Sequence, residues 1–108
     1  MGKVRNILFI MCDQLRYDYL SCNGHPHVET PHIAGLAAKT VNFVNAVEQS
    51  PLCGPSRMSY LTGRYVHSHG ATWNGVPLSV GQTNIGDFMR PLGLRCALVG
   101  KTHMEPDA

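Results

Sequence analysis

The sequence lacks any apolar run long enough to cross a bilayer, and only 15% of its residues are charged. Its net charge of +2 is too small to indicate binding to nucleic acid or to an anionic membrane surface. It also contains no internal repeat and no low-complexity segment. With 108 residues, of which 44% are hydrophobic, the composition indicates one small domain with a packed core. We therefore expect neither nucleic acid nor a membrane among the partners.

Paired cysteine spacing is also missing. No CxxC motif or Cys/His zinc pattern occurs among the four cysteines, Cys12, Cys22, Cys53 and Cys96. The start "MGKVRNILFIMCD" has basic residues and an apolar run, but the run is short and ends at Asp13 without a small-residue cleavage site. We interpret it as a strand rather than a signal peptide. Free thiols and the missing leader favour a reducing, cytoplasmic location.

Three apolar runs predict β-strands, at residues 4–12, 41–47 and 94–100. The first and last are nearly unbroken, which is typical of strands covered on both faces in a parallel sheet. The middle run alternates apolar and polar residues, as a half-buried strand does.

Helices are predicted between these runs. The first has Thr30 as its N-cap, the second extends from Pro55 to Gly63, and the third extends from Thr83, its cap, to near Gly93. The order of elements predicts an α/β fold with a mostly parallel sheet. Between the last two helices, many Gly, Ser, Pro and Asn residues predict a loop.

Polar residues follow the predicted strands where such sheets bind ligands. Asp13 ends the first strand, and Lys101 and His103 follow the last one. Each also has a structural interpretation, because Asp often caps turns and lone Lys and His residues are commonly solvated. A sheet of three strands is thin and has exposed edges, so we expect the chain to be the amino-terminal piece of a longer protein.

Cys53 is the strongest single candidate for chemistry. It precedes a predicted helix start, where the helix dipole favours an anion or an ionised nucleophile, and Arg57 lies about one turn into that helix. A buried structural cysteine remains the alternative. We interpret the H-x-H pair of His25 and His27 as part of an exposed loop. His67 and His69 are interpreted as packing or supporting residues rather than metal ligands.

Four blocks of the sequence resemble one family. "CGPSR" followed by "LTGR" resembles the sulfatase signature C-x-P-S-R with T-G-R a few residues later. "GLRCALVGKTH" is similar to the family segment that ends in G-K-x-H, although Cys and Leu replace its usual residues. "NILFIMCDQ" and "TPHIAGLAAKTVNFVNAV" resemble the family's opening stretches. The chain thus resembles the formylglycine-dependent (type I) sulfatases of the alkaline phosphatase superfamily.

This resemblance implies an alkaline-phosphatase-like α/β fold, a mostly parallel sheet with helices on both faces. Residues 1–108 would be the amino-terminal portion of its catalytic domain. The implied activity is hydrolysis of a small-molecule sulfate monoester. The implied partners are that ester and a maturation enzyme that oxidises Cys53 to formylglycine. The alcohol part of the substrate and the oligomeric state stay open.

Site residues follow from the same resemblance. Asp13, Gln14 and the modified Cys53 would bind a divalent cation, with Ca²⁺ preferred over Mn²⁺ or Mg²⁺ for such oxygen ligands. Cys53, as the formylglycine gem-diol, would also be the nucleophile that Arg57 holds in place.

Further residues would meet the substrate. Lys101 and His103 would bind the anion or assist the leaving group, and Asn74 would face the substrate.

One departure from the family pattern keeps a second activity open. Gln14 stands where most sulfatases have an aspartate, and related phosphonate monoester and phosphodiester hydrolases also carry Asp-Gln here. The "GKTH" block favours a sulfatase, because those hydrolases tend to lack this Lys and His. A third possibility is a catalytically dead fragment, if the chain truly ends at Ala108 without the family's remaining metal ligands.

Overall fold

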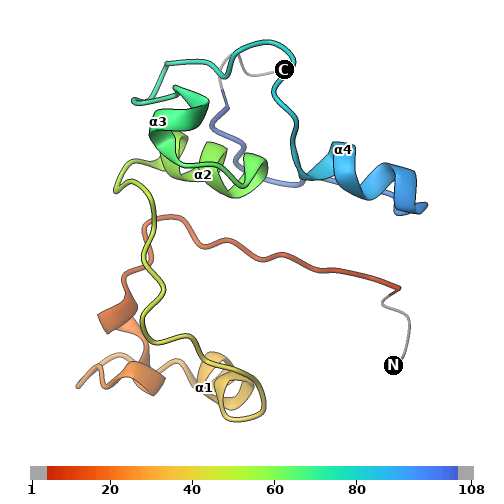
Figure 1. Cartoon of the computed structure of the whole chain (residues 1–108). Helices are drawn as coiled ribbons and strands as arrows, with labels where there is room; N and C mark the ends of the chain where they lie inside the picture. The colour runs from red at the N-terminus through yellow and green to blue at the C-terminus, as the bar shows by residue number, and fades with distance from the viewer. Residues whose placement is uncertain (1–4, 105–108) are drawn as a thin grey trace. The chain divides into compact units, whose positions relative to one another are not determined.

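The computed structural model describes residues 5–104, and within that range it contains helices but no β-strand. Contacts divide the chain into two compact units, residues 10–47 and a larger unit formed by the segment up to Phe9 with the segment from Glu48 onward. Each unit is described by itself. In chain order the elements are η1 (Tyr17–Tyr19), η2 (Ser21–Asn23), α1 (Pro31–Ala37), α2 (Cys53–Thr62), α3 (Val66–His69), α4 (Ile85–Met89) and η3 (Arg90–Leu92), shown in Figure 1.

The three predicted strands are not strands in this structure. Residues 5–12, 41–47 and 94–100 run as irregular chain, and Val4 of the first prediction lies outside the described residues. Their apolar side chains are largely exposed, with Leu8 at 84% and Val99 at 92%. A strand exists only through hydrogen bonds to a neighbouring strand, and the described part of the chain forms no such ladder. These segments therefore have the apolar sequence pattern of buried strands but are not hydrogen-bonded to neighbouring strands among the described residues.

In the smaller unit, two hydroxyl side chains connect η2 to the start of α1. Thr30 occupies the N-cap position of α1 with Pro31 next, as predicted, but its hydroxyl makes no capping bond to the helix. Instead the Ser21 amide donates to Thr30 Oγ1 (3.0 Å), and the Thr30 amide donates to Ser21 Oγ (3.1 Å). This reciprocal pair fixes where the helix begins.

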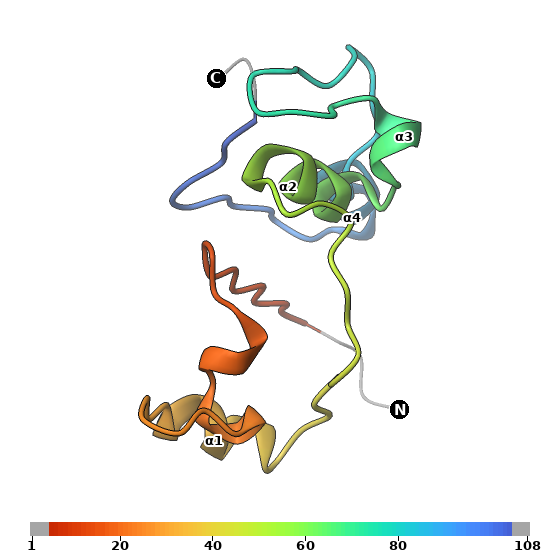
Figure 2. The same ribbon diagram turned by 90° about the vertical axis from the view of Figure 1, so that its left-hand side faces the viewer.

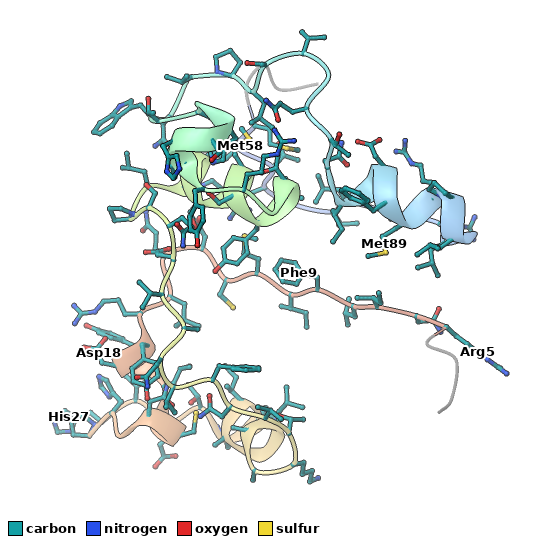
Figure 3. All side chains as sticks on the ribbon, viewed as in Figure 1. Arg5, Phe9, Asp18, His27, Met58 and Met89 are labelled. Carbon is teal, nitrogen blue, oxygen red and sulfur yellow. The ribbon has the colours of Figure 1, made fainter. Side chains whose placement is uncertain are left out.

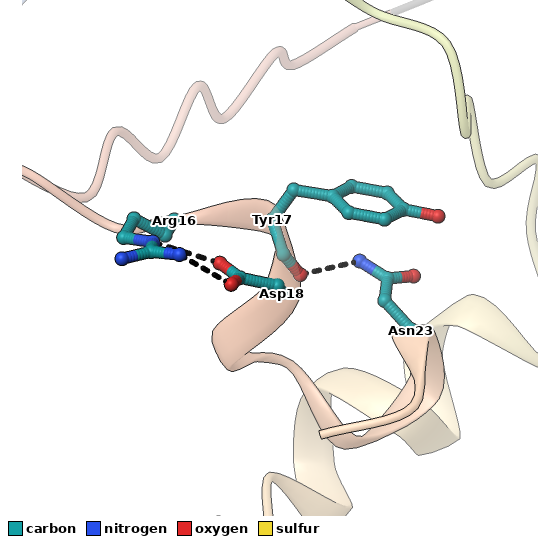
Figure 4. A network of polar contacts seen from close by, with 4 residues as sticks. All are labelled: Arg16, Tyr17, Asp18 and Asn23. Atoms are coloured by element: carbon teal, nitrogen blue, oxygen red, sulfur yellow. Dashed lines mark hydrogen bonds and ion pairs between the residues drawn. The ribbon is translucent and has the colours of Figure 1, made fainter.

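A short polar network orders the turn before η2 (Figure 4). Arg16 pairs with Asp18, its Nε donating to Oδ1 at 2.9 Å, and Asn23 Nδ2 donates to the Tyr17 carbonyl at 3.0 Å. The hydrogen bond and charge of Arg16 hold the pKa of the Asp18 carboxyl below its ordinary value. Both side chains are exposed, so the pair orders the turn locally and adds little to overall stability.

In the larger unit, α2 packs against α3, as Figures 1 and 2 both show. Met58, labelled in Figure 3, is 1% exposed, and His69 of α3 is 2% exposed. Helix α2 ends at Gly63, as predicted, because that residue adopts the left-handed conformation (φ 66°) that closes a helix. Its start differs from the prediction: Cys53, not Pro55, is the first helical residue. The predicted loop after α2 is present, except that α3 occupies its first residues.

Helix α4 shows which residue caps the third predicted helix. The prediction of Thr83 as the cap is wrong, because Asn84 occupies that position. Its Oδ1 accepts from the Gly86 amide at 2.8 Å, while Asp87 Oδ2 accepts from the Asn84 amide at 2.9 Å, a reciprocal capping box. The helix passes into η3, where Pro91 lies, and Gly93 closes it in the left-handed conformation, as predicted.

The capping box gives a direct test. We expect Asn84→Ala in the full-length protein to raise amide exchange over α4 about fivefold, because losing an N-cap costs about 1 kcal/mol. Thr83→Ala is the matched control and should leave that exchange unchanged. Hydrogen exchange read by mass spectrometry measures both, and equal effects of the two variants would contradict this assignment of the cap.

Candidate active site

The first turn of α2 carries the nucleophile candidate. Cys53 is the first helical residue and is half-buried. The N-cap position is occupied by Leu52, whose side chain has no acceptor for the free amides of the first turn. Asn74, 20 residues later, supplies one instead: its Oδ1 accepts from the Gly54 amide at 2.9 Å. The structure thus brings Asn74 to the residue beside Cys53.

Arg57 connects this helix to the end of the described chain. The guanidinium is largely buried, with 9% of the residue exposed, and its Nη1 donates to the Lys101 carbonyl at 2.7 Å, across 44 residues. The arginine of the C-x-P-S-R motif therefore contacts the G-K-x-H segment directly. The side chain of Lys101 is exposed at this junction.

His103 lies just beyond that junction in a constrained conformation. Its φ of 50° is unusual for a residue other than glycine, and its Nδ1 is buried without a hydrogen-bond partner among residues 5–104. A buried imidazole nitrogen with no partner retains its capacity to accept or donate a proton.

The predicted metal ligands are divided between the two units. Asp13 and Gln14 belong to the smaller unit, where they form an exposed turn with Gln14 at φ 55°, whereas Cys53 belongs to the larger one. A carboxylate and an amide oxygen are chemically suited to a hard divalent cation. Residues 5–104 contain no group of three or more His, Cys, Asp or Glu side chains arranged to hold a metal ion. The assignment of these three residues as metal ligands stays a prediction.

His69 of α3 makes a hydrogen bond to α2, the helix that begins at Cys53. Its Nδ1 accepts from the Ala71 amide at 3.1 Å, so the ring proton lies on Nε2, which donates to Ser59 Oγ at 3.0 Å. Burial lowers the pKa of this imidazole, and the nearby Pro55 carbonyl partly offsets that shift. A neutral histidine thus joins α3 to α2, in line with the packing role predicted for it.

The other H-x-H pair is part of a loop. His25 Nδ1 accepts from the amides of His27 (3.1 Å) and Val28 (2.7 Å), which fixes the turn and occupies that ring nitrogen. The interpretation as an exposed loop is consistent with this arrangement.

Two contacts of this region were not predicted from the sequence, that of Gly54 with Asn74 and that of Ser59 with His69. One signal for the first was available: an apolar residue at a helix N-cap indicates that the cap comes from elsewhere. No comparable local signal exists for the second, because it depends on how α3 packs.

Comparison with known proteins shows the family of this chain. The chain matches the family model described as Sulfatase over residues 5–108, almost its entire length. The chain belongs to the sulfatase family. It is 38% identical over 100 residues to an ulvan-active sulfatase of Formosa agariphila, covering 93% of this chain and 20% of that protein. It is also 38% identical over 104 residues to an arylsulfatase of Clostridium perfringens, covering 94% of this chain and 21% of the relative.

A third relative has a name that is not restricted to sulfatase activity. The multifunctional alkaline phosphatase superfamily protein PehA of Trinickia caryophylli is 36% identical over 108 residues, covering 95% of this chain and 21% of that protein. The chain thus spans about a fifth of the length of these relatives. Within the described residues, none of its helices is long and apolar enough to span a membrane.

The lowered pKa of buried His69 leads to a prediction of how the free energy of unfolding depends on pH. Because the pKa of His69 is lowered in the folded protein, the unfolded state binds its proton first as the pH falls below about 6.5. The free energy of unfolding should therefore decrease in that range, by at most about 1.4 kcal/mol per pH unit for this one proton.

Urea denaturation of the full-length protein between pH 5 and 8 measures this decrease. His69→Gln should remove the part of the slope that belongs to this residue. The control is His67→Gln. His67 is an exposed residue of α3 whose ring stacks on Tyr65, and the variant should keep the wild-type slope. An unchanged slope in His69→Gln would refute the assignment.

Proposed function

We propose that this sulfatase-family chain provides the nucleophile and anion-binding segment of an enzyme that hydrolyses a sulfate monoester. The observation that supports it best is the bond from Arg57 to the Lys101 carbonyl, which joins the C-x-P-S-R motif to the G-K-x-H motif. Family membership and the sulfatase names of the relatives point to the same chemistry. A cation next to the reacting ester stabilises the charge that develops on the non-bridging oxygens.

The sulfatase domain implies an alkaline-phosphatase-like α/β fold. We infer further that the exposed apolar runs become strands of a mostly parallel sheet with helices on both faces. The exposure of these runs supports this inference. Residues such as Leu8 and Val99 are apolar but exposed here, and the strands of a parallel sheet covered on both faces would bury them.

We infer that Cys53 is converted to formylglycine by a maturation enzyme that reads the C-x-P-S-R segment. The hydrated aldehyde would supply one hydroxyl that attacks sulfur and a second whose deprotonation releases sulfate with return of the aldehyde. Within the described chain, Arg57 holds the first turn of α2 near Lys101, whose ammonium would bind the anion. His103 Nδ1 would exchange a proton with the ester or its leaving group.

Asn74 would meet the substrate through its amide. Since Oδ1 accepts from Gly54, the Nδ2 donor is the end available for an anionic oxygen. Asp13 and Gln14 would hold a divalent cation together with the modified residue 53, and these oxygen donors suit Ca²⁺, the cation proposed here, as well as Mn²⁺ or Mg²⁺. Such a cation would stabilise negative charge on the ester.

A phosphonate monoester or phosphodiester hydrolase is the second candidate. Gln14 favours it, because related phosphonate monoester and phosphodiester hydrolases also carry Asp-Gln at this position. The amide would leave the metal site with one negative charge fewer than the usual aspartate. The similarity to a multifunctional alkaline phosphatase superfamily protein is consistent with this alternative.

The nucleophile can be tested by mass spectrometry of the peptide that carries residue 53. We expect formylglycine in full-length protein produced together with its maturation enzyme. Cys53→Ala should lower turnover by at least about 10³-fold while leaving the fold intact, because no other group provides the attacking hydroxyl. Fully active enzyme with an unmodified thiol would rule out the mechanism.

The two candidate activities can be separated by substrate. We expect kcat/KM for an aryl sulfate to exceed that for the aryl phosphonate with the same leaving group. The reason is that Lys101 and His103 are both present, whereas the phosphonate hydrolases tend to lack this pair. Matching the leaving group removes its contribution from the comparison. A large preference for the phosphonate would make the phosphonate hydrolase, rather than the sulfatase, the favoured activity.

A further inference from the structure

The amide of Gly54 is capped from a distant part of the chain. In most helices the N-cap side chain accepts from the amides of the first turn, as Asn84 does for the Gly86 amide in α4. Helix α2 has Leu52 at that position and no side-chain capping bond from it. The acceptor is Asn74 Oδ1, 2.9 Å from the Gly54 nitrogen.

Gly54 has almost no space for a side chain. A Cβ built on its backbone would lie 2.8 Å from Asn74 Oδ1 and 3.5 Å from Asn74 Cα, and the first distance is too short for a real contact. The residue is buried in α2 and does not need glycine for its backbone conformation, since it is absent from the residues with positive φ. The requirement for glycine therefore comes from Asn74.

We propose that Gly54 and Asn74 are a matched pair that positions residue 53 for catalysis. The glycine leaves room for the asparagine oxygen, and that oxygen fixes the amide next to the nucleophile and hence the first turn of α2. This role belongs to the folded protein and is separate from recognition of the unfolded C-x-P-S-R segment, in which the variable residue is position 54. Asn74 is here a positioning residue, in addition to any contact with the ester.

The proposal also explains how the Asn74 amide is oriented. A backbone N–H can only donate, so the oxygen of the amide must face Gly54 and the NH₂ group must face the other way. The catalytic consequence rests on the proposed sulfatase function, whereas the capping consequence does not.

Hydrogen exchange over residues 52–58 of the full-length protein tests the pair without reference to activity. We expect Gly54→Ala and Asn74→Ala each to raise exchange about fivefold, and the double variant to raise it no further, because both changes break one bond. Asn74→Asp keeps an acceptor oxygen and should retain most of the protection. Gly35→Ala in α1, where a Cβ meets nothing within 4 Å, is the control and should not raise exchange over residues 52–58.

Turnover provides the second readout. We expect formylglycine occupancy at residue 53 to stay at the wild-type level in Gly54→Ala, while kcat per modified site on an aryl sulfate falls on the order of tenfold to a hundredfold. Additive exchange effects in the double variant, or unchanged exchange in Gly54→Ala, would overturn the pairing. Coupled exchange with unchanged kcat would overturn its role in positioning the nucleophile. Coupled exchange in a protein that does not hydrolyse sulfate esters would instead refute the sulfatase proposal and leave the capping pair in place.

Discussion

Helix α2 depends on side chains that come later in the chain. The side chain of its own N-cap residue, Leu52, offers no acceptor, so Asn74 satisfies an amide of the first turn and His69 supports the helix from α3. The neutral form of His69 is essential to this arrangement, because Nδ1 accepts from a backbone amide while Nε2 donates to Ser59. The position of residue 53 is therefore set by the loop that follows α2 as much as by the helix itself.

Sequence patterns predicted the helices well because their signals are local. Pro31 and Gly93 mark a helix start and a helix end through backbone geometry alone, and both stand where they were predicted. The cap of α4 was misplaced by one residue, since Thr83 and Asn84 are both good caps and only the reciprocal bond with Asp87 distinguishes them. The start at Cys53 was missed because Pro55 suits the first turn of a helix, not only its first position.

Strands could not be predicted in the same way, because a strand is a property of two segments. The runs at 5–12 and 94–100 have the composition of buried strands, yet they form no ladder among residues 5–104. For the site, the motifs predicted Cys53, Arg57 and Lys101; the family is shown, and the roles of these residues stay predictions. The contact of Arg57 with the Lys101 carbonyl has no signature in the sequence, and the apolar residue before α2 indicates only that the Gly54 amide is capped from elsewhere, not which residue caps it.

The contact between Arg57 and Lys101 is made to the backbone of the lysine, not to its side chain. A carbonyl oxygen is present whatever residue occupies position 101, so the arginine can anchor this segment to α2 independently of the chemistry displayed there. Substitutions at position 101 can therefore alter the charge offered to a ligand while the segment stays attached. Anchoring uses the backbone of this residue, whereas the anion binding proposed for Lys101 would use its side chain, so selection could change the second without undoing the first.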